Sequence, residues 1–398
     1  MNKGLATSKR FILVLGLLTG MVAFAIDISL PAIPSMVRDL GTSMSHGQQV
    51  VGFFMAGLAV GQLPAGLISD RIGRMPVLYV GMVVATLAGV AMSMSNNITV
   101  ILFARFIQGI GASAGMVLAR AIVRDISSGQ QAARLMSLMV MIFTAAPMIA
   151  PLLGAYLVVA FDWHAPFVAV TVAAVLILFG IKTSLQETHR PSNKSSMRQQ
   201  LGMSLKAFKS TPQCLFGLMV ALATIAGIMT LVSGSASLVV ELYRFPVQSF
   251  GYIFALTGVS ILIGSTINRR LLKRHSPLQM IGFGAALAGI AGTQLLIMAW
   301  MGAANFWWLW GNACLFMCAT AFLLPNATAF ALEPVPEIAG VAASLIGTAQ
   351  SLVGATSAIV SSLLYTGTIL TVTLGVGLSS IAAALVFLYK KQVLGDVA

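Results

Sequence analysis

The sequence contains very little charge: only 8% of its 398 residues are charged, and only 10 are acidic. Soluble domains carry about 25% charged residues, because their surfaces must face water. Here 58% of the residues are hydrophobic and the mean hydropathy is +0.95, so most of the surface must face an apolar medium. The scarcity of charge therefore excludes a soluble globular protein and indicates a polytopic membrane protein.

Residues that carry metal or covalent chemistry are also few. The three cysteines lie in apolar runs and the four histidines are scattered over separate links, so the sequence assembles no metal-ligand cluster. It also offers no convincing nucleophile–base pair and no phosphate-binding loop of the G-x-x-x-x-G-K-[ST] type. We therefore expect no enzyme, no metal site and no cofactor, and a proton gradient rather than ATP as the source of energy.

The net charge of +13 is distributed in a pattern that describes topology. Lys and Arg gather on every second link and at both ends of the chain, at 3–10, 71–74, 120–134, 182–209, 269–274 and 390–391. The intervening links hold almost none, apart from Arg38 and Arg244. Under the positive-inside rule this alternation predicts that both termini are cytoplasmic. We accordingly expect no nucleic-acid partner.

The apolar runs predict twelve transmembrane helices, since about 20 apolar residues cross a bilayer. The expected spans are 10–33, 47–68, 76–95, 98–120, 134–160, 164–183, 213–241, 247–268, 278–301, 305–331, 338–364 and 367–390. A polar, basic stretch divides them six and six. This predicts a six-helix bundle over 1–183, a cytoplasmic linker over 184–211 and a second six-helix bundle over 212–398.

The first run also has the form of a secretory signal, with Lys9 and Arg10 before the apolar residues and Ala23-Phe24-Ala25 as a cleavage site. Cleavage there would leave an odd number of spans and contradict the charge alternation. We therefore interpret this run as a transmembrane helix that continues past Asp27.

The short polar link 66–77 has the spacing G-x-x-x-D-R-x-G-R, formed by Gly66, Asp70, Arg71, Gly73 and Arg74. It lies between the second and third spans and resembles the corresponding loop of the major facilitator superfamily of transporters. The resemblance implies that this loop, together with Asp125 at the end of the fourth span, gates the conformational change. We expect Asp125 to pair with Arg71 or Arg74, and Asp70 to accept from a helix N-terminus. A solvated cluster that only sets topology is the alternative.

Two charges lie inside the predicted spans. A carboxylate at a helix centre costs about 2.5–3.5 kcal/mol on insertion scales, which makes Asp27 a candidate proton site. Arg105 is its expected partner and shares a helix face with Gln108. Arg105 and Gln108 resemble the R-x-x-Q-G-x-G motif that is implicated in proton coupling in related drug antiporters. The alternatives are a carboxylate that reaches the interface and an arginine that only stabilises helix packing.

The fifth span contains Pro147, Pro151 and Gly154 in the run Ala-Pro-Met-Ile-Ala-Pro-Leu-Leu-Gly. The prolines remove backbone donors and the glycine allows close packing. This resembles the G-P-x-x-G-G motif of facilitator exporters, although alanines replace the glycines before the first proline. We expect a bendable helix that seals one half against the other, with an ordinary kink as the alternative.

Three further stretches resemble the bicyclomycin and chloramphenicol resistance (Bcr/CflA-type) branch of drug:proton antiporters: 27–34, 233–243 and 333–350. The resemblance covers about 10–390 and implies an all-α fold of two pseudo-symmetric six-helix halves, with the substrate between them. The implied pocket residues are Met21, Phe24, Asp27, Arg105, Gln108, Met229, Ser233, Phe322 and Asn326. The 22 methionines and 21 phenylalanines favour an adaptable apolar pocket for lipophilic compounds.

The sequence thus predicts a monomeric, multi-pass protein of the cytoplasmic membrane that exports amphipathic small molecules in exchange for protons. Two alternatives remain: a transporter of a specific metabolite such as a nucleoside, amino acid or sugar, and a non-transporting membrane scaffold or sensor.

Overall fold

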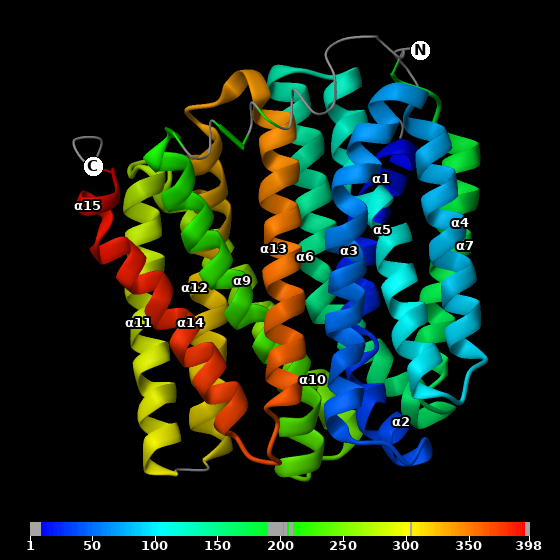
Figure 1. The fold of residues 1–398 in the computed structure, drawn as a ribbon, viewed down its shortest axis with the longest axis vertical. Coiled ribbons are helices and arrows are strands. Elements are labelled where there is room, and N and C mark those ends of the chain that lie inside the picture. The colour runs from blue at the N-terminus through cyan, green and yellow to red at the C-terminus, as the bar shows by residue number, and fades with distance from the viewer. Residues whose placement is uncertain (1–8, 190–201, 203–204, 207–209, 303–304, 395–398) are drawn as a thin grey trace. The chain divides into compact units, whose positions relative to one another are not determined.

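The computed structural model describes residues 9–189, 202, 205–206, 210–302 and 305–394 (Figure 1). Within these residues the chain contains helices and no strand. Twelve helical segments are long and apolar enough to cross a membrane, as predicted. A helix satisfies its own backbone hydrogen bonds, which is why apolar spans of this length take that form.

The helices of the first part of the chain are α1 (Lys9–Asp27), α2 (Ile33–Asp39), α3 (Met44–Ile72), α4 (Arg74–Ser93), α5 (Ile98–Ile126), α6 (Gly129–Ala160) and α7 (Ala165–Ser184), with a 3₁₀ turn η1 (Leu30–Ala32). The second part comprises α9 (Pro212–Ala236), a π-helical turn η2 (Ser237–Leu242), α10 (Val247–Leu271), α11 (Pro277–Met301), α12 (Phe306–Leu332), a 3₁₀ turn η3 (Pro336–Ile338), α13 (Ala339–Leu363), α14 (Leu370–Leu388) and α15 (Lys390–Leu394).

The chain packs into two compact units. The first comprises Met1–Lys194 with Phe245–Ala255, and the second comprises Ser195–Arg244 with Leu256–Ala398. The start of α10 thus belongs to the first unit, where a Cβ on Gly251 would lie 2.8 Å from the Leu152 Cα atom of α6. Much of the predicted 184–211 linker lies outside the described residues.

The two units repeat one pattern of helix contacts. In the first, α1 packs against α5, α6 and α7, and α4 packs against α5 and α7. In the second, α9 packs against α12, α13 and α14, and α11 packs against α12 and α14. These contacts of α1 and α4 therefore recur six spans later, in agreement with the predicted pseudo-symmetric repeat.

The first span is interrupted, contrary to the continuous helix predicted over 10–33. Helix α1 ends at Asp27, and the chain turns through Ile28 and Ser29 before η1 and α2. The cause is Pro31, which has no N–H to donate to the carbonyl of Asp27 four residues earlier and whose ring clashes with that carbonyl. The break therefore lies directly after the buried acid.

The polar link between the second and third spans is much shorter than predicted. Helix α3 continues through Asp70 and Arg71 to Ile72, and α4 begins at Arg74. Only Gly73 separates the two helices, with φ of 101°. This conformation is rarely adopted by a residue with a Cβ, so the glycine alone makes the turn.

Candidate functional site

The centre of the first unit is the end of α1. In an unbroken helix the Ala25 carbonyl would accept from the Ser29 amide, but that amide donates to Ile26 instead, at 3.3 Å. The last carbonyls of a helix are available to other donors and lie at the negative end of its dipole. Asp27 follows two residues after Ala25, and its side chain is only 5% exposed.

Arg105 of α5 binds the carbonyl that the break leaves free. Its Nη1 donates to the Ala25 carbonyl and to Oε1 of Gln108, both at 3.1 Å. The guanidinium carbon lies 4.9 Å from the ring centroid of Phe167 and 5.6 Å from that of Phe54. Arg105 is 1% exposed, and its charge is therefore stabilised by a helix end and two aromatic faces.

The Arg105 guanidinium has hydrogen-bond donors that no described residue accepts from. Both Nε and Nη2 of Arg105 are buried without a hydrogen-bond partner, as is Nε2 of Gln108. Buried donors are normally satisfied, so three orphaned N–H-bearing atoms in one place mark a site that an acceptor can occupy. A carboxylate or a carbonyl oxygen has the required chemistry.

The expected direct pair between Asp27 and Arg105 is not formed. Among the described residues, the Asp27 carboxylate makes no ion pair. Arg105 is held instead by the free backbone carbonyl two residues before Asp27. The structure thus places Asp27 and Arg105 at the same end of α1 without an ion pair between them.

Helix α6 closes on the break of α1 through Gly154. A Cβ at this position would lie 2.1 Å from the Ile28 carbonyl oxygen and 3.0 Å from the Pro31 ring. No side chain fits there. Pro147 and Pro151 lie inside α6, which remains helical through both of them. The motif in α6 therefore contacts the turn that follows Asp27.

A second polar cluster joins α3, α4 and α5 at Arg74. Its Nε donates to Oδ2 of Asp125 at 2.9 Å, and its Nη1 donates to Asp70 and to the Ser69 hydroxyl. Arg74 is 6% exposed, and the side chain of Asp125 is 17% exposed. The predicted partner of Asp125 is therefore Arg74, whereas Arg71 is exposed and makes no ion pair with a described residue.

Residues 187–189, which follow α7, complete this cluster and were not predicted. Oε1 of Glu187 accepts from the Arg74 amide at 2.9 Å, and Oε2 accepts from the Met75 amide at 3.0 Å. The Thr188 hydroxyl donates to Asp125 at 3.2 Å, and the His189 ring lies 3.2 Å from the Asp70 carbonyl. We call these three residues the 187–189 clamp.

Glu187 acts as an N-terminal cap for α4 from a distant part of the chain. Partial burial acts to raise the pKa of its carboxyl, but the backbone N–H groups of Met75, Arg74, His189 and Thr188 outweigh this and lower the pKa below 4.5. A carboxylate on the first amides of a helix is also stabilised by the helix dipole. Glu187 is the only acidic residue between 182 and 211, and that isolation was the available signal.

The family model for the Major Facilitator Superfamily matches residues 15–358. The chain belongs to this superfamily. Facilitator proteins are transporters, which agrees with the expectation that the chain is not an enzyme.

Two curated facilitators are similar over most of the chain. A bicyclomycin resistance protein homolog of Haemophilus influenzae is 29% identical over 339 residues, which cover 85% of each protein. Multidrug resistance protein D of Escherichia coli is 31% identical over 338 residues, covering 85% of this chain and 84% of that protein.

Among solved structures, a D-xylose-proton symporter superimposes with a TM-score of 0.76 at 15% identity, covering 98% of this chain and 99% of that one. At this identity the likeness shows the fold alone.

The remaining residues predicted to line a facilitator pocket fall into both units. In the first, Met21 is buried and Phe24 half-buried on α1, and Gln108 bonds to Arg105. In the second, Met229 is buried and Ser233 donates to the Thr230 carbonyl.

The two residues predicted on α12 make contacts inside the second unit. Phe322 is fully buried and makes an edge contact with Phe283 of α11. Asn326 donates to Asn268 of α10 at 2.9 Å. Asn268, the last residue of the predicted span 247–268, lies within α10 and is buried.

Proposed function

We propose that this facilitator exports amphipathic small molecules across the cytoplasmic membrane in exchange for protons. The names of its curated relatives, which refer to bicyclomycin and multidrug resistance, support this class of cargo. The alternation of basic residues between successive links supports an orientation with both termini in the cytoplasm.

The observation that carries the proposal is the pair of buried ionisable groups at the end of α1. Asp27 makes no ion pair with a described residue, and Arg105 has two N–H groups without a partner. An ionised carboxylate is the acceptor that such a guanidinium binds most strongly. Proton loss from Asp27 therefore favours an Arg105–Asp27 contact, and protonation favours their separation.

This difference couples the proton to conformation. The turn at Ile28 and Ser29 gives Asp27 a place where backbone angles can change, because no continuous helix crosses it. Gly154 transmits the movement of this turn to α6, since their backbones are in contact there. A ligand shifts a conformational equilibrium only by its differential affinity for the two states, and here the proton is that ligand.

The Arg74 cluster is proposed as the gate. Its ion pairs and the 187–189 clamp fix the ends of α3, α4, α5 and α7 to one another within the first unit. Exposed pairs are each worth only about 0–1 kcal/mol, but Arg74 is buried and has three partners, so the cluster acts as one element. Gly66 and Gly73 belong to the same gate through their place in the motif.

The proposed cargo contacts in the first unit are Met21, Phe24 and Gln108. Those in the second unit are Met229 and Ser233, and Phe322 and Asn326 pack beside them in the same unit. Export against a gradient is driven by proton entry, for which the membrane potential supplies about 2.3 kcal/mol per charge per 100 mV.

The test is cargo-induced proton release from the purified full chain in weakly buffered detergent. The compounds are chloramphenicol, bicyclomycin and the lipophilic cation tetraphenylphosphonium. At least one should release protons from the wild type and none from Asp27→Asn, whose amide cannot titrate. Asp162→Asn is the matched control, because Asp162 is an exposed acid near His164.

Two results would contradict the proposal. Release that persists in Asp27→Asn would remove Asp27 from coupling. Uptake of these compounds into proteoliposomes that is unaffected by a pH gradient would remove proton antiport.

A further inference from the structure

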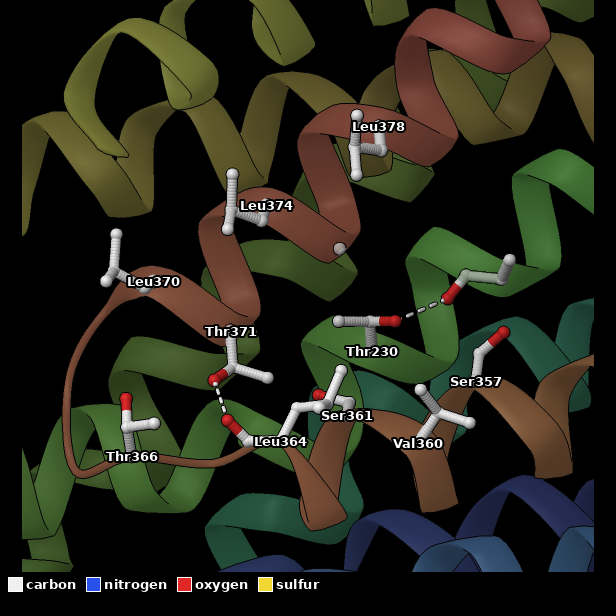
Figure 2. Close-up of a pocket in the computed structure, with 12 residues that line it drawn as sticks. Thr230, Ser357, Val360, Ser361, Leu364, Thr366, Leu370, Thr371, Leu374 and Leu378 are labelled. Carbon is white, nitrogen blue, oxygen red and sulfur yellow. Dashed lines mark hydrogen bonds between the residues drawn. The ribbon is translucent and has the colours of Figure 1, made fainter. Parts of the chain in front are cut away.

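The second unit contains a pocket that the proposed exchange does not use. It has a volume of about 530 Å³ and lies between α9, α13 and α14, under the link from Leu364 to Leu370 (Figure 2). Small-molecule sites commonly occupy about 300–1,000 Å³, so this volume is that of a ligand site.

The walls of the pocket are apolar and lead to the outside of the unit. Leu374 and Leu378 of α14 line it and are 41% and 60% exposed, and Val360 of α13 is 46% exposed. In a membrane span such side chains meet hydrocarbon. An apolar molecule therefore reaches the pocket from the lipid phase without crossing water.

Two of the hydroxyls in the pocket are already used. The Thr230 hydroxyl donates to the Ala226 carbonyl at 2.9 Å, and the Thr371 hydroxyl donates to the Leu364 carbonyl at 3.0 Å, as the dashed lines of Figure 2 show. Such bonds to the preceding backbone satisfy the hydroxyl without any ligand.

Ser361 differs from these two. It lines the pocket and is only 6% exposed, and its Oγ has no hydrogen-bond partner. An unsatisfied buried hydroxyl is costly, and a ligand acceptor in the pocket would remove that cost. Ser361 therefore supplies a buried hydroxyl without a partner, in a site whose other hydroxyls belong to Thr230, Ser357, Thr366 and Thr371.

We propose that this pocket binds an apolar chain bearing one carbonyl or ester oxygen, which accepts a hydrogen bond from Ser361. The site is separate from Asp27 and Arg105, which belong to the other unit. An ester-linked membrane lipid and an amphipathic cargo molecule both have this chemistry.

The test uses two photoreactive probes of equal chain length, methyl dodecanoate and tetradecane, each with a diazirine in the chain. The purified full chain in lipid nanodiscs is titrated with each probe and irradiated, and labelled peptides are mapped by mass spectrometry. The ester should label 357–378 with higher affinity than the hydrocarbon. Ser361→Ala should weaken the ester about 3- to 10-fold and leave the hydrocarbon unchanged, as loss of one neutral hydrogen bond predicts.

Ser362→Ala is the matched control. Ser362 is the next residue of α13, is fully buried, donates to the Ile359 carbonyl at 2.7 Å and does not line the pocket. It should leave both probes unchanged. A third variant, Ala226→Phe, fills the pocket and should abolish specific labelling by both. Equal affinity for the two probes, or equal effects of Ser361→Ala and Ser362→Ala, would overturn the proposal.

Competition then separates the two sources of the ligand. Displacement of the ester by added phosphatidylglycerol assigns the site to lipid, and displacement by chloramphenicol assigns it to cargo. Displacement by neither contradicts the proposal. Labelling is measured without a proton gradient and should persist in Asp27→Asn. A failure of the pocket proposal is therefore distinguishable from a failure of the proton-exchange proposal.

Discussion

The two units share helix order and helix contacts but differ in the polarity of what they bury. In the first, the helix ends are joined by ionised groups, with Arg105 on the end of α1 and Arg74 paired to Asp125. In the second, α10 and α12 are joined by two neutral amides, Asn268 and Asn326. Among the described residues, the buried charged side chains Asp27, Arg74 and Arg105 all lie in the first unit, whereas the buried contact between α10 and α12 in the second is neutral.

The same contrast holds where each unit's first span meets its fifth. In the first unit, Gly154 of α6 lies against the turn after Asp27 and leaves no space. In the second unit, α9 has no proline after its first residue, Pro212, and stays helical into the π-helical turn η2, and a pocket lies between α9, α13 and α14. The break in α1 is thus covered by a close-packed partner, whereas the intact α9 has a cavity beside it.

The strongest test of this contrast removes the charge from the first unit. Arg105→Met takes away bonds from a charged donor to Ala25 and Gln108, which are worth about 1.5–3 kcal/mol each. Cargo-induced proton release should therefore fall by about 10-fold or more. Arg105→Lys retains a charge but not the planar fork, and should restore only part of the release.

The matched change in the second unit is Asn268→Leu. It should lower thermal stability, because Asn326 loses its partner, yet leave proton release per folded molecule unchanged. Equal losses of release in Arg105→Met and Asn268→Leu would show that the charged and neutral contacts have the same role.

Sequence alone predicted the twelve spans and the pairing of Asp125 with Arg71 or Arg74, of which the structure forms the pair with Arg74. These follow from strong signals: uninterrupted apolar length, alternating basic links, and a motif with five fixed positions. Each is local or periodic, and therefore readable without knowledge of the packing.

The details of the site were not predictable because they depend on which distant groups meet. The predicted span 10–33 ran straight through Pro31, and only the packing shows that the Ala25 carbonyl left free before the break is bound by Arg105, 80 residues away. Glu187 was assigned to a linker, since nothing in a polar segment indicates that it caps α4. Ser361 was one of many hydroxyls in apolar spans until its missing partner set it apart.

A smaller effect is expected at the contact between α6 and the break in α1. Gly154→Ala places a methyl 2.1 Å from the Ile28 carbonyl oxygen, so α6 must move away from the turn. Overpacking of this kind costs about 1–3 kcal/mol, and thermal unfolding should shift downward accordingly. Proton release should also weaken, because the turn after Asp27 loses its support.

Gly289→Ala in the second unit is the control for the same chemical change. Its methyl would lie 3.4 Å from Ala384, which is ordinary contact, and the helix should gain from the better helix former. If the two variants unfold at the same temperature, the close approach of α6 to α1 is not a constraint on the first unit.

The smallest effect concerns the 187–189 clamp, and it depends on pH. The pKa of Glu187 is lower in the folded chain than its usual 4.5, so its capping is present above that pH and is lost as pH falls through the folded pKa. At neutral pH, Glu187→Gln should raise hydrogen exchange of the Arg74 and Met75 amides about two- to threefold, a modest effect for an exposed cap. Once the pH has fallen below the lowered folded pKa of Glu187, the variant and the wild type should exchange alike, since both side chains are then neutral. Glu333→Gln is the matched change in the second unit, where the carboxylate accepts from the Gln213 side chain rather than from a helix N-terminus, and it should leave exchange at these amides unaltered. If the difference in hydrogen exchange between Glu187→Gln and the wild type persists unchanged at low pH, the start of α4 is stabilised by the packing of this side chain and not by its ionised carboxylate.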